Sequence, residues 1–192
     1  MYKSSKISKM TGIGLFIAIT AVLTIIGNSI TIGPVAINLS LIPITIGSII
    51  FGPLAGFILG AANGVIVLLA PSTSLFLSHN VFLTIVTCIL KTGLAGLISG
   101  FAYKLFRKIK EGFGVVVASI LTPLINTAIF ALCVFLFFYD LLLAGQGSNA
   151  FAYFALVIVG WNFVFEISIS CILCPTIIHV TKVLKNKTER EN

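Results

Sequence analysis

The sequence predicts an all-α integral membrane protein with six transmembrane helices and both termini in the cytoplasm. Of its 192 residues, 58% are hydrophobic and only 9% are charged, and the mean hydropathy is +1.17. A soluble domain of this length has too little core to bury so much apolar surface. Apolar runs of about 20 residues, the length that crosses a bilayer, fill the chain. We therefore expect a single membrane domain over residues 1–192.

The expected spans cover about residues 10–28, 37–51, 54–70, 82–105, 114–139 and 153–181. The first follows three lysines, as a signal peptide does, but no clear cleavage site comes after it and many apolar runs follow. We therefore interpret it as a transmembrane helix. Prolines fall inside the second, fifth and sixth spans, where neighbouring helices or water can satisfy the carbonyl groups that a proline frees.

The basic residues predict the orientation. Eleven of the twelve lysines and arginines lie before the first span, between the fourth and fifth, or after the sixth. With six spans these three segments share one side of the membrane, and an excess of positive residues marks the cytoplasmic side. The connections on the other side carry no basic residue, so we expect them to face outward.

The segment from Asn38 to Gly64 predicts a helical hairpin with one closely packed face. Gly56, Gly60 and Gly64 continue a four-residue repeat that begins at Gly52, so they lie on roughly one side of a helix. Such a face lets a second helix approach at backbone distance. A Gly-Pro-Leu-Ala-Gly turn joins the two arms, and the charge pattern places it at the cytoplasmic side.

Two ionisable residues lie within spans, Lys91 in the fourth and Glu166 in the sixth. Charges inside a membrane are costly and are candidate functional residues by default. The alternatives are a structural ion pair between the two, contact with a ligand, and a side chain that reaches water. The sequence leaves these interpretations open.

Other polar and aromatic residues are weaker candidates. Trp161 is expected to be either an interfacial residue or a stacking wall for an aromatic ligand beside Asn162. His79 and Asn80 could hydrogen-bond a ligand, or Asn80 could cap a helix next to a solvated histidine. Asn126 is expected to join helices more than to contact substrate.

Several classes of function are excluded. The sequence has no Walker A, H-E-x-x-H or G-x-S-x-G motif, so we expect no enzyme activity and no cofactor. All four cysteines lie in apolar runs and are interpreted as packing residues, and no metal site is expected. The net charge of +7 is spread over short connections with no basic patch, so nucleic-acid binding is not expected.

The motifs resemble those of substrate-binding S components of energy-coupling factor (ECF) vitamin transporters. The similarity rests on Leu-Ile-Pro at 41–43, on Phe-Gly-Pro-Leu-Ala-Gly at 51–56 and on the glycine-rich fourth span from Lys91 to Lys104. The resemblance implies a multi-pass protein of the bacterial plasma membrane that binds a water-soluble vitamin or related micronutrient from outside. A transmembrane coupling subunit and two cytoplasmic ATPases would drive its uptake. The alternative is a self-sufficient secondary permease, for which no convincing internal repeat is found.

The resemblance also implies two surfaces. The first helix would dock on the coupling subunit through small residues, which here are Gly14, Ala18 and Ala21. The ligand would lie beneath the outer loops and the outer ends of the last three spans. The positions that this places near the ligand are Asn38, His79, Asn80, Trp161 and Asn162.

Overall fold

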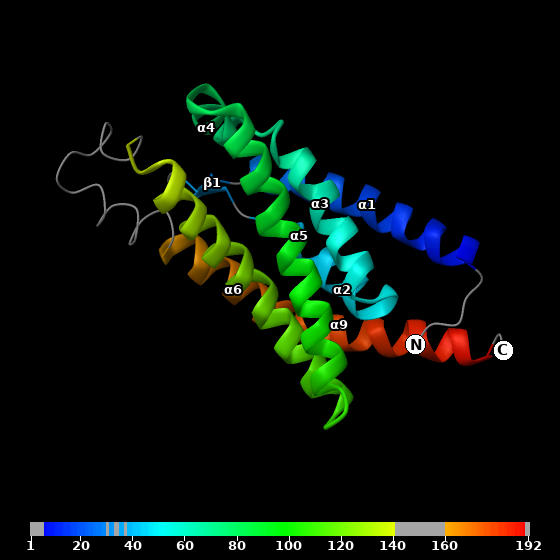
Figure 1. Cartoon of the computed structure of the whole chain (residues 1–192). Coiled ribbons are helices and arrows are strands. Elements are labelled where there is room, and N and C mark those ends of the chain that lie inside the picture. Colours follow the sequence, from blue (N-terminus) through cyan, green and yellow to red (C-terminus); the bar gives the residue numbers. More distant parts are fainter. Residues whose placement is uncertain (1–5, 30, 33–34, 37, 141–159, 191–192) are drawn as a thin grey trace.

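A computed structural model describes residues 6–29, 31–32, 35–36, 38–140 and 160–190 of the chain. Apart from one pair of two-residue strands, its elements are helices (Figure 1). In chain order they are α1 (Lys6–Ser29), β1 (Thr31–Ile32), β2 (Val35–Ala36), α2 (Leu41–Phe51), α3 (Pro53–Val67), η1 (Pro71–Thr73), α4 (Ser74–His79), α5 (Val81–Phe106), α6 (Glu111–Phe137) and α9 (Trp161–Arg190). The strands pair antiparallel, with Thr31 opposite Ala36 and Ile32 opposite Val35.

Among the described residues, three helical segments are long and apolar enough to cross a membrane: Lys9–Ser29, Val81–Phe106 and Glu111–Phe137. α3 and the following η1–α4 segment are together long and apolar enough as well, with a bend of 80° between them. Two further helical segments, Leu41–Phe51 and Phe163–His179, are apolar but shorter. The predicted class of helical membrane protein is therefore confirmed, with three or four candidate spans. The number six stays a prediction.

The second and third expected spans are shorter than predicted. The strand pair and a turn at 39–40 precede α2, which begins at Leu41 and has 11 residues. Pro43 thus lies in its first turn, where a missing N–H breaks no helical hydrogen bond. α3 ends at Val67, and Pro71 starts the bend toward α4, because a proline disfavours helix in the residue before it.

Gly52 alone makes the turn between α2 and α3. Its φ of 100° lies in the region that only glycine adopts readily. Pro53 then begins α3 at a position that suits proline. The predicted five-residue turn is therefore one residue long, and the two helices follow each other almost directly.

The predicted glycine face exists, and α5 is the helix that packs against it. A Cβ added to Gly56 would lie 2.3 Å from the Gly96 carbonyl oxygen, and one added to Gly60 would lie 2.1 Å from that of Thr92. At Gly64 the nearest atom would be the Cys88 carbonyl oxygen, at 2.5 Å. The two backbones are thus in contact at three positions along just over two turns. Gly52 does not belong to this face, because nothing lies within 4 Å of a Cβ built there.

α2 lies at the centre of the bundle and contacts α1, α3, α5, α6 and α9. One apolar cluster joins Ile49 of α2 to Tyr103 of α5, Val115 of α6 and Ile177 of α9. Figure 1 shows the start of α1, the α2–α3 turn, the α5–α6 connection and the end of α9 toward the lower right, and β1, α4 and the end of α6 toward the upper left.

Candidate functional site

The carboxyl group of Glu166 lies inside the bundle, where α9 packs against α6. The residue is only 3% exposed. Its Oε2 accepts hydrogen bonds from two neighbouring α6 residues, from Asn126 Nδ2 at 3.4 Å and from Thr127 Oγ1 at 3.1 Å. Its Oε1 is buried and has no hydrogen-bond partner. Asn126 thus joins two helices, as predicted, and half of the carboxyl group is left free.

Lys91 does not form the direct ion pair that the sequence left open. No ion pair of 4.0 Å or less joins it to Glu166. Its Nζ instead lies 4.7 Å from the centre of the Phe130 ring on α6, a cation–π contact. Lys91 still interacts electrostatically with the Glu166 carboxylate. The two charges therefore act on each other across a gap, without contact.

Two further buried polar atoms in this region have no partner. These are Asn126 Oδ1 and Thr87 Oγ1, on residues that are 2% and 4% exposed. Thr84 and Thr92 of the same helix each donate to the carbonyl four residues earlier, so Thr87 differs from its neighbours. A buried polar group without a partner costs about 1–3 kcal/mol and is uncommon in native proteins.

Helix geometry brings these residues together. Thr87 and Lys91 are four residues apart on α5, and Asn126 and Phe130 are four apart on α6, so each pair shares a helix face. Lys91 is ten residues from the start of α5, which places it about 15 Å along the helix. Lys91 and Asn126 lie well inside α5 and α6, and Glu166 lies in the second turn of α9. We call this group the polar cluster; its members are Thr87, Lys91, Asn126, Thr127, Phe130 and Glu166.

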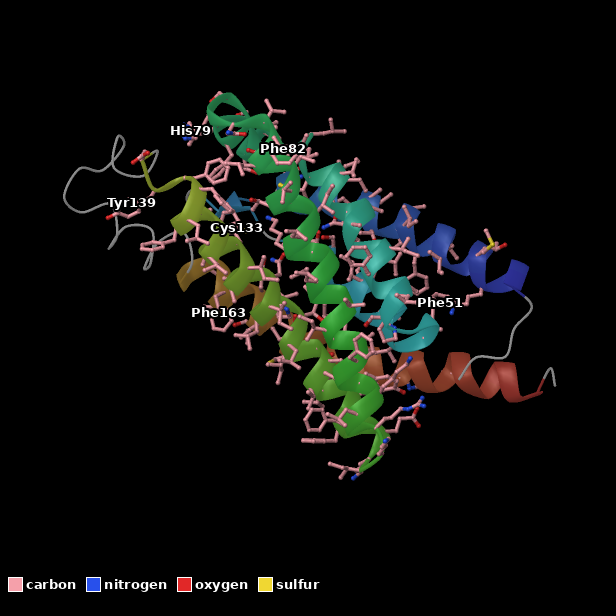
Figure 2. All side chains as sticks on the ribbon, in the orientation of Figure 1. Phe51, His79, Phe82, Cys133, Tyr139 and Phe163 are labelled. Carbon is pink, nitrogen blue, oxygen red and sulfur yellow. The ribbon has the colours of Figure 1, made fainter. Side chains whose placement is uncertain are left out.

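Among the residues expected near the ligand, Asn80, His79 and Asn38 have partners within the protein. Asn80 caps α5, because its Oδ1 accepts from Leu83 N–H at 3.1 Å, which confirms the alternative interpretation of this residue. His79 is exposed at the end of α4 (Figure 2). Its ring centre lies 5.8 Å from that of Phe138. Asn38 precedes α2 and accepts a hydrogen bond from Ser40.

Asn80 is 11 residues before Lys91, or about 16 Å along the same helix, so this group and the polar cluster are distinct. Trp161 and Asn162 are the first two residues of α9, but their side chains lie outside the described residues. Their expected contacts with a ligand stay predictions.

The small residues of α1 lie on its outer side. Gly14 and Ala18 are exposed and Ala21 is half-buried, with nothing within 4 Å of a Cβ built on Gly14. Large apolar side chains flank them, such as Leu15 at 59% and Val22 at 55% exposure. This face of α1 is unoccupied by the rest of the described chain.

Sequence reasoning missed three members of the cluster: Thr87, Thr127 and Phe130. A search for polar or aromatic residues one turn from each intramembrane candidate would have found Thr87 and Phe130, which are four residues from Lys91 and Asn126. Thr127 directly follows Asn126. All three lie among aliphatic residues in the sequence, and their residue types alone did not mark them as candidates.

Nothing in the described chain forms a metal centre, since no group of three histidine, cysteine, aspartate or glutamate side chains converges there. Cys88, Cys133 and Cys174 are buried, in keeping with packing residues, whereas Cys171 is exposed. All four are free thiols.

Comparison with known proteins identifies the family of the chain. The family model for the substrate-specific component of ECF transporters matches residues 8–178, which is most of the chain and includes the whole polar cluster. Searches of curated proteins and of solved structures returned no match. Members of this family bind a substrate for transport and are not enzymes. The chain therefore belongs to the family of ECF transporter substrate-specific components.

Proposed function

We propose that this S component binds a water-soluble vitamin or related micronutrient from outside the cell, and that the polar cluster forms part of the binding site. The observation that carries the proposal is the set of unpartnered buried atoms on Glu166, Asn126 and Thr87. Ligand sites hold a few polar groups in an otherwise apolar setting. A ligand that pairs with these atoms removes their desolvation cost and so gains affinity.

We propose six spans, with both termini in the cytoplasm of a bacterial cell. The charge pattern supports this orientation, because the three segments rich in lysine and arginine then share one side. The arrangement in Figure 1 supports it as well, since the beginning of α1, the basic α5–α6 connection and the end of α9 lie toward the same side of the view.

Energy would come from partner subunits. The sequence has no Walker A motif, so a transmembrane coupling subunit and two cytoplasmic ATPases supply the driving force in our proposal. The exposed face of α1 around Gly14, Ala18 and Ala21 would dock on the coupling subunit, because small residues allow close helix contact. Different affinities for substrate in the free and docked states would then give direction to transport.

Asn38, His79, Asn80, Trp161 and Asn162 would line the outer part of the site in this proposal. Asn162 is four residues before Glu166, so one turn of α9 separates them along the backbone. Asn80 retains its amide N–H groups for a ligand, because the cap uses only its Oδ1.

The test is a thermal-shift measurement on detergent-purified protein with each water-soluble vitamin in turn, together with mass spectrometry of any small molecule that copurifies. We expect at least one vitamin to raise the melting temperature, because a ligand stabilises the state that it binds. If no vitamin does so and none copurifies, the proposed substrate class is wrong. Uptake into liposomes by this chain alone would favour the secondary permease instead.

A further inference from the structure

The polar cluster carries one potential negative and one positive charge, on Glu166 and Lys91. They act on each other at a distance greater than 4.0 Å, so neither is neutralised by direct contact. A ligand with a large net charge of either sign would be repelled by one of them. The cluster therefore suits a ligand that brings a donor for one group and an acceptor for the other.

The unpartnered atoms on Glu166 and Asn126 can serve one ligand, because the two side chains are in contact. Asn126 Nδ2 lies 3.4 Å from Glu166 Oε2, so the free oxygens, Asn126 Oδ1 and Glu166 Oε1, belong to two side chains that touch each other. The amide orientation follows from this contact, because an N–H group faces the carboxylate and the amide oxygen points elsewhere. With the Glu166 carboxyl group ionised, both free atoms accept hydrogen bonds, so a complementary ligand donates two, as adjacent N–H groups do.

Lys91 provides the opposite chemistry. Its ammonium group has three donors, and the Phe130 ring face receives it 4.7 Å from the ring centre. The ring holds the ammonium in place and accepts no conventional hydrogen bond from it. Phe130 is one turn from Asn126 on α6, so the ring that receives the ammonium lies on the same face of α6 as the Asn126 amide. A carbonyl or carboxylate oxygen on the same ligand could accept from Lys91.

We propose that the substrate contains an amino-substituted planar heterocycle. Its amino group and a ring N–H donate to Glu166 and Asn126, and an oxygen acceptor faces Lys91. This inference rests on the proposed function, because it assumes that the polar cluster binds substrate. Among the water-soluble compounds that such proteins bind, it selects those in which two adjacent hydrogen-bond donors lie next to an oxygen acceptor.

Two probes test the donor–donor edge. Isocytosine has a ring N–H beside an amino group and a carbonyl oxygen beyond it, whereas uracil has a second carbonyl in place of the amino group. Ligand-observed NMR on the purified protein gives the ratio of their dissociation constants. A hydrogen bond to a charged group contributes about 1.5–3 kcal/mol, so we expect isocytosine to bind roughly 10- to 100-fold more tightly than uracil.

The matched variants are Glu166→Gln and Glu111→Gln. In Glu166→Gln the side-chain oxygen can still accept from Thr127, but an NH₂ group replaces the free acceptor. A hydrogen-bond acceptor thus becomes a donor at this position, so we expect the preference for isocytosine over uracil to be lost or inverted. Glu111 lies at the start of α6 and accepts from Tyr103 at 3.2 Å, so the same substitution there should leave the preference unchanged.

The outcomes separate the two proposals. Equal binding of both probes by the wild-type protein, or an unchanged preference in Glu166→Gln, overturns the inferred substrate class. The same holds if neither probe binds while a vitamin without an amino-substituted ring raises the melting temperature, and the proposed function then stands. If Glu166→Gln does not fold, the wild-type ratio still decides, because it requires no variant.

Discussion

Replacement of Gly60 by alanine should separate α3 from α5. The added Cβ would lie 2.1 Å from the Thr92 carbonyl oxygen, whereas ordinary contact begins at 3.4 Å, so one helix must retreat by about 1.3 Å. Overpacking of this kind costs about 1–3 kcal/mol. The retreat also stretches the hydrogen bond of 2.6 Å from Thr92 Oγ1 to the Gly60 carbonyl, and such bonds between membrane helices contribute about 0.6 kcal/mol. We expect a total loss of about 2–4 kcal/mol.

The free energy of unfolding can be measured by titrating mixed micelles with sodium dodecyl sulfate while following helix content. Gly112→Ala is the matched control, because nothing lies within 4 Å of a Cβ at that residue in the first turn of α6. It should be neutral or slightly stabilising, since alanine favours helix over glycine by up to about 1 kcal/mol. If Gly60→Ala is as stable as Gly112→Ala, the backbone contact between α3 and α5 does not exist.

Three further changes have expected outcomes in the same unfolding assay. Thr87→Val should stabilise the ligand-free protein by about 1 kcal/mol because it removes an unpartnered hydroxyl. Thr92→Val should destabilise it, because the Thr92 hydroxyl donates to the Gly60 carbonyl. A change of the same sign in the free energy of unfolding of both variants would contradict this account. Asn80→Ala should cost about 1 kcal/mol through loss of the α5 cap, and Asn80→Asp should restore it; no rescue by aspartate would argue against capping. Gly52→Ala should cost about 1 kcal/mol or more because of the φ of 100°, and an unchanged stability would show that this turn adopts another conformation.

The glycine face was predictable because its signal is local. Gly56, Gly60 and Gly64 recur with the period of a helix, and small residues in a membrane helix have one common use. Which helix packs against them was not predictable, because Gly96 and Thr92 lie far along the chain. The length of α2 was also missed, since an apolar run such as Leu41–Phe51 does not reveal that a turn at 39–40 precedes the helix.

The candidate site was predictable only in part. Lys91 and Glu166 stood out because charge is rare inside a span. Their relation depends on side-chain geometry: Phe130 receives the ammonium group, and Asn126 and Thr127 receive one oxygen of the carboxylate. No sequence pattern distinguishes that arrangement from a direct ion pair. Asn80 was a candidate ligand residue because it is polar and lies at the start of a helix. The same residue type and position also predict that it caps α5, as it does.

The short α2 has a consequence for the lipid around the protein. Eleven residues rise about 16 Å, roughly half of a hydrocarbon core about 30 Å thick. In the proposed six-span arrangement, the chain between α1 and α2 covers the remaining depth, and its described residues form β1, β2 and the turn at 39–40. Such backbone is stable at membrane depth only against protein or water. In that arrangement the helices that α2 contacts, α1, α3, α5, α6 and α9, must keep acyl chains away from this segment.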